Sequence, residues 1–342
     1  MRRSRLFAFL LAIFTAGSAS ANGLRATLEV DRTWLTSQDD LLATVTLTND
    51  GARAVQLPRW QIPGARLEAN LFDVTRDGKP VDYLGILAKR RAPTPADLVT
   101  IAPGQSVSGR TELTRAYDMN DGGEYLVVYR LELATINRAQ EVASGAVAIW
   151  RDAPIRAALD WDATDAVISP EALSYTNCSS SQQSGVSTAF NSATSYSTGA
   201  KSYLNSKTYS TVGPRYTTWF GAINSGRFDT TKSHFVSIED AFVTKPVVVD
   251  CGCTENYYAY VYPTQHYKIY VCNAFWTAPN TGTDSRAGTL VHEMSHFNVV
   301  AATDDWAYGQ TACKSLARKK PTRAVANADS HEYFAENTPV LN

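Results

Sequence analysis

The sequence predicts two domains, an N-terminal all-β sandwich followed by an α+β domain. Three observations predict this division. Hydrophobic and polar residues alternate in short segments of residues 22–150, aspartate and proline are frequent in residues 151–173, and residues 174–342 contain stretches of helical period. The 342 residues, 44% of them hydrophobic and 19% charged, are enough for two globular domains.

Charge and hydropathy argue against two classes of partner. The 32 basic and 33 acidic residues leave a net charge of -1, so no basic surface is available to neutralise nucleic-acid phosphates. No stretch has the roughly 20 apolar residues that a membrane-spanning helix needs. We expect neither nucleic acid nor a membrane as a partner, and we expect a monomer.

The N-terminus has the pattern of an export signal. The apolar run Leu6–Phe14 follows three arginines and precedes the small residues Ala19–Ala21. This order predicts a secretory signal peptide over residues 1–21, and therefore a secreted protein.

Residues 22–150 are expected to form the strands of the sandwich. The clearest predicted strands are 26–30, 42–47 and 125–131, and turn residues occur at 49–51 and 121–123. Residues 151–173 then interrupt the alternation with aspartates and prolines, which is typical of an exposed linker.

The α+β domain is expected to begin with a long helix, since apolar residues recur at helical spacing from Val186 to Leu204. Segments rich in β-branched and aromatic residues predict a small sheet, at 242–249, 257–262 and 267–271. The helical period returns over residues 283–297, with Asp284 as the expected N-cap.

The predicted helix 283–297 contains the pattern His-Glu-x-x-His. Side chains four residues apart lie on one face of a helix, so His292 and His296 can bind one metal ion. The pattern is typical of a zinc site in which the glutamate, here Glu293, acts on water.

A catalytic zinc needs a third protein ligand. The glycine and histidine that metzincins place downstream of the second histidine are replaced here by Val299 and Ala302. Glu332 on a later helix is one candidate for the third ligand, and Asp304 and Asp305, just after the helix, are the others.

Here the sequence resembles the aspzincin family, which comprises the deuterolysins and the peptidyl-Lys metalloendopeptidases. The family combines His-Glu-x-x-His with a downstream Gly-Thr-x-Asp-x-x-Tyr-Gly, and residues 302–309 read Ala-Thr-Asp-Asp-Trp-Ala-Tyr-Gly. The resemblance implies that Asp305 is the third zinc ligand and that the Tyr308 hydroxyl lies near the substrate carbonyl. Ala302 departs from the family's glycine.

Further stretches resemble the peptidyl-Lys branch, namely 214–221, 259–263, 275–279 and 327–329. The resemblance implies a zincin-like metalloprotease fold for residues 174–342, one zinc ion per chain, and protein or peptide substrates. Glu293 would take a proton from the attacking water, and Tyr308 would help to stabilise the charge on the carbonyl oxygen.

The same branch implies a specificity. Asp329 and Glu332 would line the pocket for the residue after the cleaved bond, and two carboxylates there select an ammonium group. Cleavage is therefore expected on the amino side of lysine. Two alternatives remain open: a protease of deuterolysin-like specificity, and a secreted binding protein whose zinc is structural.

The five cysteines lie in the second half of the chain, where export favours disulfides. The family layout implies the bridges Cys178–Cys251 and Cys253–Cys272. Cys313 would then be a buried free thiol in a helix.

The all-β domain 22–150 is interpreted as a removable propeptide that inhibits the enzyme or assists its folding. A permanent binding module is the alternative. Because no cysteine precedes Cys178, a propeptide thiolate cannot bind the zinc. Inhibition would be steric, or would place a basic residue such as Lys89 in the acidic pocket.

Maturation is expected to require a cut within residues 151–173. No lysine lies between Lys89 and Lys201. A second protease is therefore favoured over self-cleavage before Arg151 or Arg156.

Overall fold

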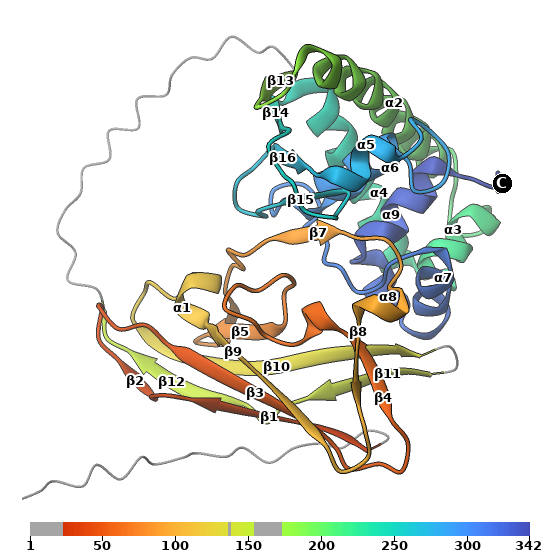
Figure 1. The fold of residues 1–342 in the computed structure, drawn as a ribbon. Coiled ribbons are helices and arrows are strands. Elements are labelled where there is room, and N and C mark those ends of the chain that lie inside the picture. The colour runs from red at the N-terminus through yellow and green to blue at the C-terminus, as the bar shows by residue number, and fades with distance from the viewer. Residues whose placement is uncertain (1–22, 136–137, 154–172) are drawn as a thin grey trace, which may run out of the picture.

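Figure 1 shows the computed structural model, which describes residues 23–135, 138–153 and 173–342. The predicted signal peptide 1–21 and Arg156 lie outside the described residues. Within the described ranges, no helix has both the length and the apolar character needed to cross a membrane.

In the described N-terminal residues, two sheets enclose one hydrophobic core. The first has the order β1-β3-β9, and the second the order β2-β12-β10-β5-β6, with β11 paired to β10. Inward residues alternate along the strands, as Leu24, Ala26 and Leu28 do in β1, and the core also contains Tyr125 and Tyr129. The elements are β1 (Leu24–Val30), β2 (Trp34–Leu35), β3 (Leu42–Asn49), β4 (Val55–Pro58), β5 (Phe72–Arg76), β6 (Lys79–Pro80), β8 (Leu98–Ile101), β9 (Ser106–Glu112), α1 (Leu113–Ala116), β10 (Gly123–Thr135), β11 (Arg138–Ala143) and β12 (Val147–Arg151).

The three strands expected from alternation lie within β1, β3 and β10. Arg151, placed at the start of the predicted linker, is instead the last residue of β12. It is buried, and its guanidinium donates to the carbonyls of Ser37 at 3.1 Å and Asp39 at 3.2 Å. A protease therefore has no access to Arg151 in this conformation.

The C-terminal region is a mixed sheet packed against helices. Its strands are β13 (Leu173–Thr176), β14 (Val247–Asp250), β15 (Ala259–Val261) and β16 (Lys268–Val271). Strands β13, β14 and β16 are parallel, and β15 is antiparallel to β16. The helices are α2 (Ser180–Asn205), α3 (Pro214–Phe220), α4 (Ser225–Thr244), α5 (Asn273–Thr277), α6 (Arg286–His296), α7 (Gln310–Lys319), α8 (Pro321–Val325) and α9 (Ala328–Glu336).

One predicted strand of this region starts too early. The segment 242–249 was expected to be extended, but Phe242 lies in α4 and the strand begins at Val247. The reason is that Phe242 continues the buried stripe of Phe235 and Ile238, whose spacing is helical. β-Branched and aromatic content alone did not reveal this period.

A strand from the N-terminal region completes the C-terminal sheet. Strand β7 (Leu87–Lys89) pairs antiparallel with β15, which gives the sheet order β13-β14-β16-β15-β7. Figure 1 shows β7 lying between the two regions, beside β15. Ile86 and Ala88 share a small core with Tyr257 and Cys272, so the two regions are packed together at this strand.

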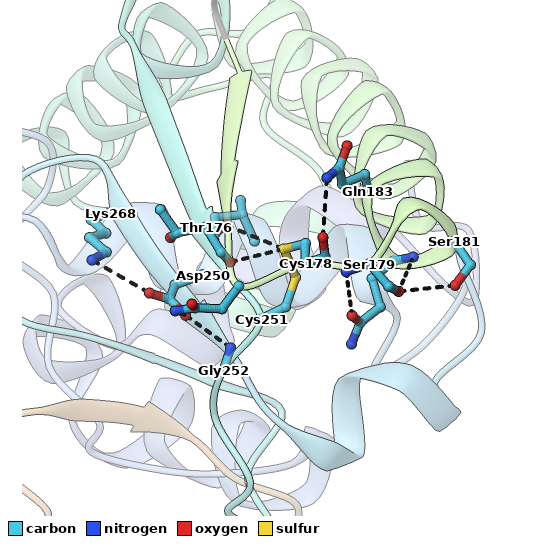
Figure 2. The surroundings of a disulfide bond; sticks show 12 residues. Thr176, Cys178, Ser179, Ser181, Gln183, Asp250, Cys251, Gly252 and Lys268 are labelled. Atoms are coloured by element: carbon cyan, nitrogen blue, oxygen red, sulfur yellow. Dashed lines mark hydrogen bonds and ion pairs between the residues drawn. A yellow bond between two sulfur atoms is a disulfide. The ribbon is translucent and has the colours of Figure 1, made fainter.

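Two disulfides fix the loops of the C-terminal region. Cys178, just before α2, is bonded to Cys251 at the end of β14, as Figure 2 shows, and Cys253 is bonded to Cys272. The backbone N–H of Cys251 also donates to the Thr176 carbonyl at 2.9 Å. Cys313 is a buried free thiol in α7.

Candidate active site

Helix α6 carries the His-Glu-x-x-His pattern and is buried along its length. It begins one residue later than expected, because Ser285, not Asp284, is the N-cap. The Ser285 hydroxyl accepts a hydrogen bond from the Gly288 N–H at 2.9 Å. Asp284 has a φ of 52°, and its carboxylate does not cap the helix. It accepts a hydrogen bond from the Tyr333 hydroxyl at 2.6 Å instead.

Three side chains converge beside this helix. The Nε2 atoms of His292 and His296 are 3.1 Å apart, and Asp305 Oδ1 lies 3.2 Å from the first and 3.5 Å from the second. Ligands that surround one zinc ion tetrahedrally at 2.0–2.1 Å are about 3.3 Å apart. These residues therefore fit a zinc ion without rearrangement.

The second ring nitrogen of each histidine fixes the orientation of the ring. His296 Nδ1 lies 2.8 Å from the Thr303 carbonyl oxygen, and His292 Nδ1 lies 2.8 Å from Asp329 Oδ1. Such partners place a proton on Nδ1 and leave the Nε2 lone pair for a metal.

The turn after α6 brings Asp305 back to the histidines. Thr303 is held by two contacts to Ser295, one from its N–H to the carbonyl at 3.1 Å and one between the hydroxyls at 2.6 Å. Ala302, at the position where the family pattern has glycine, has a φ of 47°. The left-handed conformation expected of the glycine is therefore kept here by an alanine.

Glu293 is fully buried beside the three converging side chains. Burial raises its pKa to about 7. Its Oε1 accepts a hydrogen bond from the Lys89 backbone N–H at 3.1 Å, and Oε2 has no hydrogen-bond partner among the described residues. One oxygen is thus available for water while the other faces a peptide N–H.

Tyr308 lies on the opposite side of the same peptide. Its hydroxyl donates to the Ala88 carbonyl oxygen at 3.0 Å. Tyr308 and Glu293 therefore contact the two ends of a single peptide bond, the one between Ala88 and Lys89.

The Lys89 side chain is fully buried in an acidic cluster formed by Asp284, Asp329 and Glu332. Its Nζ lies 2.6 Å from Glu332 Oε2, 3.3 Å from Asp329 Oδ1 and 3.4 Å from Asp284 Oδ1. Burial alone would lower the pKa of Lys89, but the three carboxylates outweigh it and hold the pKa well above its usual range.

Glu332, the alternative third ligand, lies on the other side of His292. Its Oε2 is 3.5 Å from Nδ1, not from the Nε2 that faces Asp305. His292, Asp329 and Glu332 are also close enough together to hold a cation, and the Lys89 ammonium already lies among them. The geometry therefore favours Asp305 over Glu332 and over Asp304, whose Oδ2 accepts a hydrogen bond from Asn70 at 3.1 Å.

Comparison with known proteins gives this site a family. Residues 203–336 match the aspzincin M35 model, described as lysine-specific metallo-endopeptidase. The chain is 43% identical to the extracellular protease of Aeromonas hydrophila over an alignment that covers 100% of both chains. The chain belongs to the aspzincin family.

Two further proteins are similar to this chain. The chain is 38% identical to the peptidyl-Lys metalloendopeptidase of Grifola frondosa, over 88% of this chain and 89% of the relative. A solved zinc peptidase from Grifola frondosa is 49% identical and covers 48% of this chain and 100% of its own, with a TM-score of 0.46. As an aspzincin, this chain is a zinc metalloendopeptidase that acts on proteins or peptides.

Three contributors to this aspzincin site were missed in the sequence. Asp284 was taken for a helix cap, and no local pattern singled out Tyr333 as its partner. The third is Glu336, whose Oε1 accepts hydrogen bonds from the N–H of Ser285 at 2.9 Å and its hydroxyl at 2.8 Å. Glu336 thereby ties the start of α6 to α9, the helix that carries Asp329 and Glu332.

Proposed function

We propose that this aspzincin is a secreted endopeptidase that cleaves on the amino side of lysine and is made as an inactive precursor. The observation that carries the proposal is the position of Lys89. Its ammonium is buried in the acidic cluster while its backbone N–H contacts Glu293. A lysine bound in this way presents the peptide bond on its amino side to the general base.

In this proposal His292, His296 and Asp305 hold one zinc ion. When bound, zinc supplies a Lewis acid that polarises the peptide carbonyl and makes water more acidic. Glu293 takes a proton from the attacking water and delivers it to the leaving nitrogen. The Tyr308 hydroxyl donates to the carbonyl oxygen as its negative charge increases.

The acidic cluster accounts for the selectivity. Burying an unpaired carboxylate is costly, so a substrate without a cation at this position would leave Asp329 and Glu332 uncompensated. Arginine would fit less well than lysine, because its planar guanidinium is wider than an ammonium group. A deuterolysin-like specificity receives no support from this arrangement.

The proposal of an inactive precursor is based on strand β7. We propose that residues 1–21 direct export, that 22–150 form a propeptide domain, that 151–173 contain the processing site and that 174–342 form the catalytic domain. As long as β7 is paired with β15, no substrate can reach Glu293. This favours a removable inhibitor over a permanent binding module.

A product map tests the specificity. The processed enzyme should be incubated with a denatured test protein, and the new N-termini identified by mass spectrometry. We expect lysine at nearly all of them, and none from the Glu293→Gln variant, which should fold and bind zinc normally. Hydrophobic residues at the new N-termini would contradict the proposal.

A further inference from the structure

We infer that the precursor is its own first substrate, and that the bond it cuts is Ala88–Lys89, inside the propeptide domain and not in the linker. This inference rests on the proposed function, because it requires cleavage before lysine. It adds a cleavage site outside the predicted linker.

Strand β7 is held by hydrogen bonds on both sides of the Ala88–Lys89 bond. Lys89 pairs with Ala259 and Ala88 with Tyr260, and the Tyr258 N–H donates to the Lys89 carbonyl at 3.0 Å. On the other side of the bond, the Ala88 N–H donates to Asp305 Oδ2 at 3.2 Å. The backbone is therefore fixed on both sides of the Ala88–Lys89 bond.

The groups proposed to react already contact this bond. Tyr308 donates to the Ala88 carbonyl oxygen, and Glu293 accepts from the Lys89 N–H. An inhibitor that merely blocks access needs neither contact. Holding a peptide in the geometry of reaction is itself a large part of catalysis.

Lysines are rare in the first 200 residues of the chain. Lys79 and Lys89 are the lysines of residues 22–200. Lys79 is exposed in β6, at the end of the sheet β2-β12-β10-β5-β6. It is not among the residues that contact the acidic cluster. Within one molecule, Lys89 is thus the lysine positioned for cleavage.

The reaction is a hydrolysis. The oxygen of water bonds to the Ala88 carbonyl carbon, and the bond from that carbon to the Lys89 nitrogen breaks. One proton of the water passes through Glu293 to the Lys89 nitrogen. The second proton of the water also ends on this nitrogen, so the products are a carboxylate at Ala88 and a protonated amine at Lys89.

The cut would weaken the propeptide without releasing it at once. Arg90, the next residue, stays bound through Glu68 at 3.1 Å and through the rings of Trp60 and Tyr257. Cleavage severs the covalent link between β6 and β8, so the two halves of the domain are afterwards held only by non-covalent contacts.

The experiment follows the purified full-length precursor with zinc. Intact mass and N-terminal sequencing should reveal a new N-terminus, Lys89-Arg90-Arg91, which forms at a rate unchanged by tenfold dilution. Lys89→Ala should abolish this product, whereas the matched control Lys79→Ala should not affect it. Glu293→Gln should leave the bond intact.

A second readout does not depend on turnover. In the full-length Glu293→Gln precursor, the backbone amides of 86–90 should exchange hydrogen slowly, and adding Lys89→Ala should accelerate this exchange at least tenfold. If an active preparation cuts added protein before lysine but keeps Ala88–Lys89 intact, this inference fails while the proposed function stands. If no substrate is cut before lysine, the proposed function fails as well.

Discussion

Asp329 Oδ1 lies 2.8 Å from Nδ1 of His292, and the same oxygen lies 3.3 Å from the ammonium of Lys89. One carboxylate atom thus contacts both a proposed zinc ligand and the side chain that the enzyme would select. Its pKa, which burial alone would raise, is held below its usual range by Lys89 and His292. In the proposed mechanism, metal binding and substrate selection therefore depend on a shared residue.

The first prediction separates these two roles. Asp329→Ala should weaken zinc binding 10- to 100-fold, as expected when the partner of a ligating histidine is removed, and should also reduce the preference for lysine. Glu332→Gln should mainly raise KM for lysine substrates and leave the zinc content unchanged. Zinc titration and peptide kinetics on both variants check this, and equal loss of zinc from both would contradict it.

The second prediction concerns the third ligand. Asp305→Ala should lose zinc on dialysis, because two histidines alone remain, while Glu332→Ala should retain it. Metal analysis of the two dialysed variants decides the question. The reverse result would show that Glu332 is the ligand.

The third prediction assigns the Tyr308 hydroxyl to the reaction itself. Tyr308→Phe should lower kcat by about 10²- to 10³-fold with little change in KM, as removal of one oxyanion donor does. Tyr333→Phe is the matched control, because it removes a hydroxyl that contacts Asp284 and not the peptide carbonyl. It should change KM more than kcat, and a similar kcat loss in both variants would be evidence against this assignment.

The fourth prediction concerns the turn that positions Asp305. Ala302 is exposed and has a φ of 47°, so its Cβ is strained in a way that glycine avoids. Ala302→Gly should raise the free energy of unfolding by about 0.5–1 kcal/mol. Ala301→Gly, at a neighbouring residue that is not left-handed, should lower it. Denaturant titrations compare the three proteins.

The fifth prediction concerns acid stability. His234 Nδ1 lies 3.0 Å from His331 Nε2, and burial lowers the pKa of His234 to about 4 and that of His331 to about 3. The unfolded chain, with a histidine pKa near 6.5, therefore binds more protons between about pH 6.5 and pH 4. Stability should fall as the pH falls through this window.

The variant His234→Asn isolates this effect. Asparagine can donate to His331 but does not titrate in this range, so the fall of stability with pH should be shallower than in the wild type. Thermal unfolding at a series of pH values measures both slopes. Equal slopes of stability against pH in the two proteins would show that His234 does not contribute to the acid sensitivity.

Residues close in sequence were the most predictable part of this site. The spacing of His292 and His296 on one helix follows from local periodicity. Asp305 and Tyr308 were assigned through the resemblance of residues 302–309 to the aspzincin motif. Asp284 was misread because a capping pattern does not distinguish two adjacent polar residues at a helix start.

The pairing of β7 with β15 was not predicted. Its three residues show no alternation of their own, and local patterns do not record a partner more than 150 residues away in the chain. Charge complementarity was the only available clue, since it suggested that Lys89 could fill an acidic pocket. That clue indicated the Lys89 side chain. The strand that carries it, and the register of that strand against β15, are known only from the structure.

Strand β15 has a consequence for the solubility of the processed enzyme. If processing removes β7 as proposed, β15 becomes the edge of its sheet, with backbone donors and acceptors that lack partners. Such an edge can bind any extended chain, including a second enzyme molecule. With only three residues, Ala259–Val261, β15 is too short to hold another strand firmly by backbone contacts alone. Under the proposed specificity, lasting association would also require a side chain that fits the acidic cluster, and this requirement would protect the processed enzyme from edge-to-edge aggregation.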